Sequence, residues 1–249
     1  LEIIKERLER EYNIDAIITN PGTDYKVLLT NGDMVEVQSA SELPEAQKIE
    51  AIEEPWVKAE VLTPKAYLGA VIDLILKIRG VQNNIEFVDE NLTIVHFKAP
   101  LATLLTDFYD QLKSVTSGYG SLNYELDGYQ QEDLVRVDFY VASERVDALS
   151  LITHRASAVN LGQNIVRRLK EIIPRQMFKV SLQAGIGGKF IARADISAMR
   201  KNVTGHLYGG DVSRKKKLLQ KQAKGKERMK KFGKVEIPND TFAVLLKKD

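Results

Sequence analysis

Hydrophobic residues recur every three or four positions at the start of the chain. Leu1, Ile4 and Leu8 follow this spacing with charged residues between them, which predicts a helix that ends near Tyr12. Because the sequence begins inside this repeat and has no initiator Met, we expect it to be a piece of a longer protein, cut just before or inside a helix.

Alternating hydrophobic and polar positions follow the helix. Residues 14–19 predict a strand, and residues 25–30 and 34–38 predict a hairpin because they flank Asn31-Gly32. Asn-Gly is typical of two-residue hairpin turns, since both residues tolerate the positive φ that these turns require. Residues 39–54 are polar and acidic, and we interpret them as a linker.

The next stretch has the order strand, helix, strand, strand, helix, strand. Thr63 and Pro64 predict the start of its first helix, because Thr is a common N-cap and Pro suits the first helical position; Gly80 predicts the helix end. The predicted segments are 57–62, 63–78, 85–88, 92–97, 101–114 and 119–126. The side chains expected to point inward from the second helix are Leu101, Leu104, Leu105, Phe108 and Leu112. This order is that of a ferredoxin-like, split βαβ domain of the α+β class, a fold that hosts many functions.

The last part of the chain predicts a further mixed α/β region. A helix capped by Ser157 or Asn160 should run to about residue 173, where Pro174 stops it, and a short helix is expected at residues 195–202. The predicted strands are 135–141, 146–151, 178–183, 189–193 and 241–246.

Charge is distributed unevenly along the 249 residues. The total net charge is only +2, but residues 1–137 carry a net charge of −12 and residues 138–249 a net charge of +14. An acidic front and a basic back indicate a modular protein whose C-terminal part meets a polyanion. We divide the chain into the end of one domain plus the linker, the ferredoxin-like domain and a basic α/β domain, at residues 1–53, 54–134 and 135–249.

The basic residues concentrate in the stretch 208–231, which reads YGGDVSRKKKLLQKQAKGKERMKK. Residues 201–234 contain twelve Lys or Arg and only two acids. Such a run is typical of a solvated basic helix or tail, or of a segment that binds RNA phosphates, and composition alone favours neither. The apolar stripe within it is thin, so we expect residues 214–231 to form a helix weakly held by the body of the protein.

Other candidate RNA contacts are chosen by chemistry. His154 follows an apolar strand and stands beside Arg155, an arrangement suited to a phosphate or a base, and His206 and Tyr208 could stack on a base or sugar. The residues we expect to bind RNA are His154, Arg155, Arg175, Lys201, His206, Tyr208, Arg214, Lys215, Lys216, Lys217, Lys221, Lys224, Lys226, Arg228, Lys230 and Lys231.

The sequence lacks the patterns of several site classes. There is no Cys, which excludes disulfides, thiolate zinc sites and a Cys nucleophile, and no apolar run approaches the roughly 20 residues of a membrane span. The Gly187-Gly188-Lys189 turn is no P-loop, because Gln183 stands where a Gly is needed and Phe190 where a Ser or Thr is needed. The three histidines are far apart, so we predict no metal site, no catalytic residues and no enzyme activity for this chain.

Residues 54–80, EPWVKAEVLTPKAYLGAVIDLILKIRG, resemble the start of the fifth domain of elongation-factor-G-type translational GTPases. Residues 112–121 are similar to the second helix and last strand of that domain, and residues 1–12 to the last helix of the third domain. In an elongation factor G the fourth domain would lie before Glu54. Only a short stretch does so here, and we therefore expect that domain to be absent.

Four further motifs show which branch of the translational GTPases the chain resembles. VDALSLITHR, IPRQMF, ARADISAMRKNV and YGGDVSRKKKLLQKQAKGKERMK are similar to the C-terminal domain of the LepA family of back-translocating elongation factors. The resemblance implies a ribosome-dependent GTPase that moves tRNAs back by one codon on improperly translocated ribosomes and aids fidelity under stress. It implies that GTP and Mg are bound by a GTPase domain outside this chain, which itself holds no cofactor.

The resemblance also implies partners and location. The implied partners are ribosomal RNA, proteins at the base of the ribosomal stalk and the A-site tRNA. The implied protein is a monomer in the cytoplasm, with peripheral association to the cytoplasmic face of the cell membrane. An alternative function is a peripheral membrane module that places the basic stretch on anionic lipid. The thin apolar stripe and the lack of aromatic anchors argue against lipid as the main partner.

Overall fold

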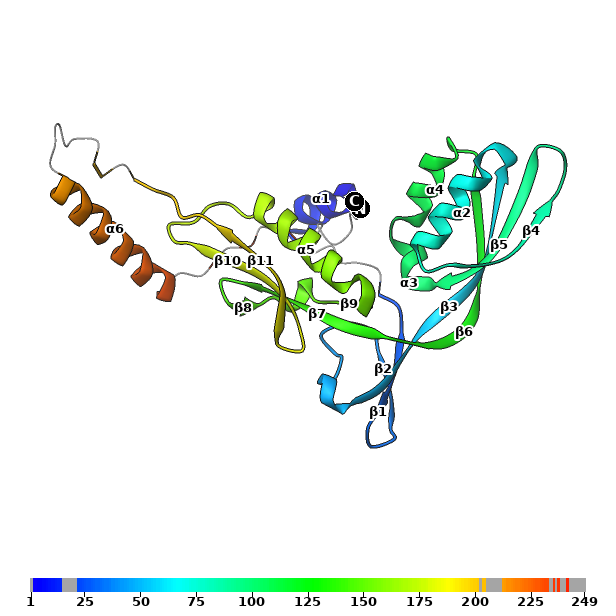
Figure 1. Cartoon of the computed structure of the whole chain (residues 1–249), viewed down its shortest axis with the longest axis horizontal. Coiled ribbons are helices and arrows are strands. Elements are labelled where there is room, and N and C mark those ends of the chain that lie inside the picture. The colour runs from blue at the N-terminus through cyan, green and yellow to red at the C-terminus, as the bar shows by residue number, and fades with distance from the viewer. Residues whose placement is uncertain are drawn as a thin grey trace.

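The computed structural model describes residues 2–14, 22–201, 203–204, 212–232, 235, 237 and 241. Figure 1 shows an elongated molecule with two sheets, each covered by helices on one face, and a basic helix at one end. A hairpin lies below the junction between the two sheets. The α+β class and the ferredoxin-like topology predicted from the sequence are confirmed.

The N-terminal part consists of one helix and one hairpin. α1 spans Glu2–Tyr12, and β1 (Tyr25–Leu29) pairs antiparallel with β2 (Met34–Val37), as predicted. Gly32 has a φ of 88°, which explains the Asn-Gly turn. Apart from Ile14, the strand predicted at residues 14–19 lies outside the described residues.

A single strand, β3 (Ile49–Pro64), connects the hairpin with the first sheet. Its first half pairs with β1, its second half with β5, and β6 pairs along most of its other edge. The prediction of a linker over residues 39–54 was therefore wrong from Ile49 onward. Glu and polar residues at alternate positions do not prevent strand pairing when the residues between them are apolar, as Ile52 is.

The first sheet has six strands in the order β2-β1-β3-β5-β4, with β6 also paired to β3, and helices cover one face of its β4-β5-β3-β6 part. Its other elements are α2 (Leu68–Lys77), β4 (Val81–Phe87), β5 (Leu92–Pro100), α3 (Leu101–Thr103), a π-helical segment (Leu104–Phe108), α4 (Tyr109–Val115) and β6 (Ser121–Glu132). Val61, Ile75, Phe97 and Leu112 lie in the fully buried core between helices and sheet.

Two predictions for this domain were wrong in detail. Thr63 does not cap a helix, because β3 continues through it and its side chain is buried in the sheet opposite Thr93. Leu105 does not point inward and is 37% exposed. The π-helical turn that contains it adds a residue to the helix and so rotates its neighbours off the expected apolar face.

The second sheet has the strand order β11-β10-β7-β8, and β9 also pairs with β7. Its elements are β7 (Leu134–Val141), β8 (Glu144–Arg145), β9 (Leu151–His154), α5 (Arg155–Ile172), β10 (Val180–Ile186) and β11 (Lys189–Ile196). α5 packs closely on one face: a Cβ on Gly162 would lie 3.0 Å from the Ile191 side chain and 3.3 Å from that of Ala184. Phe139, Leu169 and Leu182 are buried between them.

Three predictions for the second sheet were wrong. Residues 146–150 of the strand expected at 146–151 form no strand but connect β8 to β9, because Leu149 turns into the core within a 3₁₀ turn. α5 begins earlier than expected and is capped by His154, not by Ser157 or Asn160. Residues 195–202 form no helix: the first two belong to β11, where they pair with β10, and residues 197–201 have no regular structure.

α6 spans Val212–Phe232, so the predicted basic helix is confirmed. Beyond it, Val235 and Ile237 pack against the core that α5 covers, which returns the chain to the second sheet. The strand predicted at residues 241–246 lies outside the described residues except for Thr241, which is buried.

Candidate nucleic-acid interface

One side of α6 carries a continuous row of cations. At about 100° of rotation per residue, Arg214, Lys217, Lys221, Lys224 and Arg228 fall on the same side of the helix, and all five are exposed. We call these five residues the basic stripe. It extends over roughly 21 Å at 1.5 Å per residue. A row of this length presents several positive charges to one face of a partner.

A second side of α6, about 120° around the helix from the basic stripe, faces the body of the protein. Lys215, Leu218, Gln222 and Lys226 are only half-exposed. Gln222 donates a hydrogen bond from Nε2 to the backbone oxygen of Lys201 at 2.9 Å, and the Lys226 ammonium donates to the Met199 carbonyl. Two predicted RNA contacts, Lys215 and Lys226, therefore lie away from the basic stripe, whereas Lys216 is exposed on a third side.

Apolar packing contributes little to holding α6. Val212, Leu219 and Met229 are 68%, 52% and 50% exposed. Few apolar atoms leave water at this helix, so polar contacts and the returning chain at Val235 and Ile237 hold it. This agrees with the expectation of a helix weakly held by the body.

Arg175 and Lys201 lie on the same side of the molecule as α6. Arg175 is exposed just beyond the end of α5, next to Gln176, whose carbonyl accepts a hydrogen bond from the Met199 amide at 2.8 Å. Lys201 is exposed and provides the backbone oxygen that Gln222 contacts. The structure thus brings these two predicted residues close to the basic helix.

His154 and Arg155 lie elsewhere. Figure 1 places β9 and the start of α5 beside β3, far from α6 at the end of the molecule. His154 Nδ1 accepts a hydrogen bond from the Ala156 amide at 3.2 Å and so caps α5, and Arg155 Nε contacts both carboxylate oxygens of Asp133 at 3.0 and 2.9 Å. Both side chains are engaged within the protein.

The remaining predicted contacts have no described side chains. His206 and Tyr208 lie outside the described residues, and only the backbone of Lys230 and Lys231 is described, within α6.

The structure contains a buried ion cluster that the sequence analysis missed. The Glu54 side chain is 2% exposed, and its Oε1 lies 2.8 Å from Arg79 Nη1, which is 3.6 Å from Glu132 Oε2. At this distance the opposite charges of the two buried groups hold the contact. His154 Nε2 completes the cluster 3.8 Å from Glu132.

Burial raises the pKa of the Glu54 carboxyl, and the nearby Arg79 offsets only part of this effect. The residues come from β3, the end of α2, the end of β6 and the start of α5, so the cluster connects both sheets. Arg79 reaches it because its backbone turns with a φ of 63° where α2 ends. A lone Glu in a strand gives no indication of such a partner.

Known families match most of the chain. Residues 51–138 match the model described as Elongation factor G C-terminus, and residues 141–247 match the model described as GTP-binding protein LepA C-terminus. Among the described residues, no helix is long and apolar enough to cross a membrane, and no group of three or more His, Asp or Glu side chains is placed to hold a metal ion.

Similar proteins match over the entire chain. Proteins named Elongation factor 4 from Anoxybacillus flavithermus and Halalkalibacterium halodurans are 50% identical over all 249 residues, and one from Picosynechococcus sp. is 49% identical. The chain spans about two fifths of the length of these relatives, 41% in each.

Proposed function

Since the chain belongs to the elongation factor 4 (LepA) family and corresponds to the C-terminal part of its members, we propose that it is the ribosome- and tRNA-binding part of a translational GTPase. In this proposal the intact protein hydrolyses GTP, with Mg²⁺, in a part of the relatives that this chain does not cover. The chain itself supplies binding. The domain boundaries after residues 53 and 134 stay predictions. β3 continues through the first of these boundaries without a break.

The basic stripe is the observation that carries this proposal. Five exposed cations on one side of a helix match the repeating negative charge of an RNA backbone. RNA duplexes are recognised mostly through shape, phosphates and 2′-hydroxyls, which requires Arg and Lys and no catalytic groups. Arg175 and Lys201 extend the positive surface beside α6, while His154 and Arg155 would have to exchange their internal partners to reach RNA.

The finer parts of the function extend this proposal. The intact protein moves tRNAs back by one codon on improperly translocated ribosomes, acting as a monomer in the cytoplasm. The C-terminal sheet and α6 contact the A-site tRNA, and the ferredoxin-like domain contacts ribosomal RNA and proteins at the base of the stalk. The arrangement of the two parts supports this assignment, because the basic stripe and the ferredoxin-like domain lie at opposite ends of an elongated molecule (Figure 1).

Binding of this chain to ribosomes over a range of salt concentrations tests the proposal. The variant Lys217→Gln/Lys221→Gln/Lys224→Gln removes three exposed charges of the basic stripe. Each lost phosphate contact reduces the slope of log affinity against log salt by roughly 0.7–0.9, so we expect the slope to fall by about two and the affinity to fall about tenfold. The matched control, Arg7→Gln/Arg10→Gln/Lys48→Gln, removes the same charge from exposed positions on α1 and before β3, outside the surfaces that the proposal assigns to RNA, and should leave both unchanged.

Equal losses in the two variants would contradict the proposal, since the effect would then be net charge alone. Vesicles containing anionic lipid provide the comparison for the membrane alternative. If the chain binds such vesicles as tightly as ribosomes at physiological salt, and the stripe variant loses vesicle binding only, lipid is the partner of α6 and the peripheral membrane association becomes its main role.

A further inference from the structure

The face of the second sheet that α5 leaves uncovered has an ordered set of side chains. α5 packs over Ala184, so the neighbouring Gln183 points to the other face. In register with Gln183 lie Tyr140 on β7 and Arg193 on β11, and Arg145 on β8 lies opposite Tyr140. Directly opposite residues share a face, so this row crosses four strands on the uncovered side.

An aromatic pair joins this row to its neighbour, since Tyr140 lies in the row and Phe190 lies opposite Gly185 next to it. The rings of Tyr140 and Phe190 are 5.5 Å apart at 87°, so the edge of one ring meets the face of the other. Gly185 on the strand between them makes room for Phe190: a Cβ there would lie 3.1 Å from the Lys189 carbonyl and 3.4 Å from the Phe190 ring. Phe190 remains 57% exposed, a large apolar ring held in place and open to solvent.

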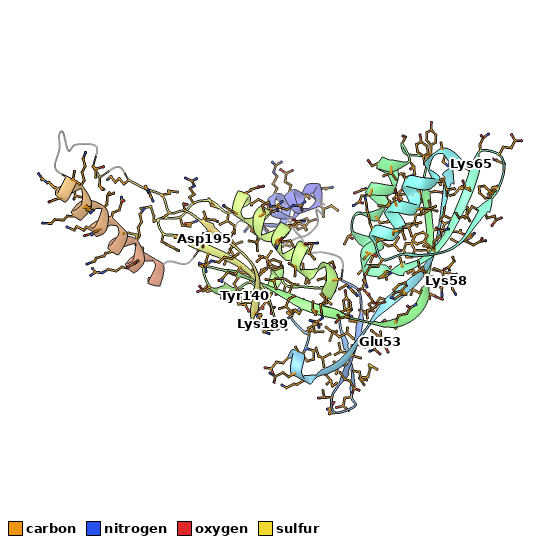
Figure 2. All side chains as sticks on the ribbon, viewed as in Figure 1. Glu53, Lys58, Lys65, Tyr140, Lys189 and Asp195 are labelled. Atoms are coloured by element: carbon orange, nitrogen blue, oxygen red, sulfur yellow. The ribbon has the colours of Figure 1, made fainter. Side chains whose placement is uncertain are left out.

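Cations surround the pair, and the carboxylates nearby are already paired. Arg145 Nε lies 2.7 Å from Asp147, and Asp195 lies 2.9 Å from Lys179 and 3.4 Å from Arg193. Asp138, which is buried, is held by Arg136 at 3.1 Å and by Ser150. Lys189, labelled in Figure 2, is exposed at the β10–β11 turn, where it lies opposite Ile186 and so on the side of α5. On the other face these ion pairs join four cations (Arg136, Arg145, Lys179 and Arg193) to three carboxylates (Asp138, Asp147 and Asp195), which leaves one net positive charge.

From this arrangement we infer that the uncovered face of the second sheet binds unpaired RNA bases. Phe190 is the stacking ring, Tyr140 holds it edge-on, and Arg145 and Arg193, whose ion pairs with Asp147 and Asp195 are partly exposed, contact the phosphates on either side. Every base has a π-face, so an exposed ring on a sheet accepts any unpaired base, and nearby cations hold the backbone. The inference rests on the proposed function in that the partner is RNA, and it adds a site with a different chemistry from the basic stripe.

The two surfaces differ in what they can bind. The basic stripe has no aromatic side chain and suits the phosphates of a duplex. The sheet face has an exposed ring, which gains nothing from a duplex because paired bases are already stacked on one another. Together, the basic stripe and the sheet face therefore favour an RNA partner that has both a double-helical and a single-stranded segment.

Fluorescence anisotropy with this chain and two labelled RNAs, single-stranded oligoadenylate and a blunt duplex, separates the two surfaces. The variant is Phe190→Leu, which keeps an apolar side chain but removes the ring. The matched control is Phe87→Leu, because Phe87 is 58% exposed on β4 of the first sheet and also has a lysine, Lys65, near its ring. Melting curves verify that both variants fold.

We expect Phe190→Leu to weaken oligoadenylate binding about tenfold and duplex binding less than twofold, with no change for Phe87→Leu. Unchanged oligoadenylate binding by Phe190→Leu would overturn the inference. So would a loss of ribosome binding without a loss of oligoadenylate binding, because the face would then contact a ribosomal protein.

The stripe variant in the same assays keeps this inference separate from the proposed function. If that variant weakens ribosome binding while Phe190→Leu changes nothing, only the sheet inference fails. If the stripe variant leaves ribosome binding unchanged, the proposed role of α6 fails whatever the result at Phe190.

Discussion

The two sheets of this molecule share an architecture but differ in their uncovered faces. Each is antiparallel with helices packed on one side (Figure 1). On the first sheet, Asp127 lies 2.6 Å from Lys58 and 2.5 Å from Lys98, and His96 lies between Glu60 and Glu86 at 3.8 and 3.5 Å. On the second, the exposed ring of Phe190 pairs with the half-buried Tyr140 on a face that also holds Arg145 and Arg193.

This difference shows where function is encoded in such a protein. The covered faces differ little, since both are apolar layers between helix and sheet. Both sheets hold carboxylates in ion pairs with cations, and the second sheet also presents the exposed ring of Phe190 near its arginines. The fold positions both faces, and side-chain chemistry decides which one binds.

The largest expected effect concerns the connection between the two sheets. Arg79→Met leaves the Glu54 carboxylate buried without its partner, and we expect the free energy of unfolding to fall by about 3 kcal/mol. Chemical denaturation at pH 7 measures this. Because the cluster connects β3 and α2 with the start of α5, unfolding of both sheets should shift together; a shift confined to one transition would show that the sheets are independent units.

The pH dependence of this variant has a definite sign. Burial raises the pKa of Glu54, so the folded state favours the protonated carboxyl, and the stability linked to it is full at low pH and decreases as pH rises through the raised pKa. Removing Arg79 strengthens this preference. The destabilisation by Arg79→Met should therefore shrink as the pH falls from 7 toward 5, and Glu54→Gln added to it should restore most of the loss at pH 7. A loss that does not depend on pH would assign the effect to lost packing of Arg79.

The sequence predicted the elements of both sheets well and their connections less well. Periodicity identifies strands and amphipathic helices because it reports which face is buried, and α1, α2 and α5 were found this way. The linker prediction failed at residues 49–54, where a partly acidic strand continues between two structural units. The cap prediction failed at Thr63, because its place in the sheet overrides its propensity to cap a helix.

The candidate sites divide in the same way. Local charge identified α6, because twelve cations within one stretch are visible without any fold. The Glu54–Arg79 pair and the Tyr140–Phe190 pair were not visible, because each joins residues that only the sheet register and the chain turns bring together. His154 was assigned to RNA from its neighbour Arg155, but its cap to the Ala156 amide depends on where α5 begins.

A smaller effect sharpens the contrast between the uncovered faces. Lys179 and Arg193 hold the pKa of Asp195 below its usual range, so this carboxylate stays charged and occupies two cations of the second sheet. Asp195→Asn frees them for phosphate, and we expect oligoadenylate to bind about threefold more tightly, in line with the modest strength of exposed ion pairs. Anisotropy at low and high salt measures this, and the gain should disappear at high salt. Weaker binding would mean that Asp195 positions Arg193 for the RNA.

The smallest effect is expected from the same substitution on the first sheet. Lys58 and then Lys98 lower the pKa of Asp127, so Asp127→Asn leaves these two lysines without the carboxylate that they share. If stacking is what distinguishes the second sheet, oligoadenylate binding should change less than twofold although the charge change equals that of Asp195→Asn. The ion pairs lost here contribute to stability above the usual pKa of Asp, so the difference in melting temperature between Asp127→Asn and the unmodified chain should shrink as the pH falls through the lowered pKa. An increase in binding equal to that of Asp195→Asn would show that net charge alone governs both faces, and the difference between the two sheets would then have no bearing on RNA.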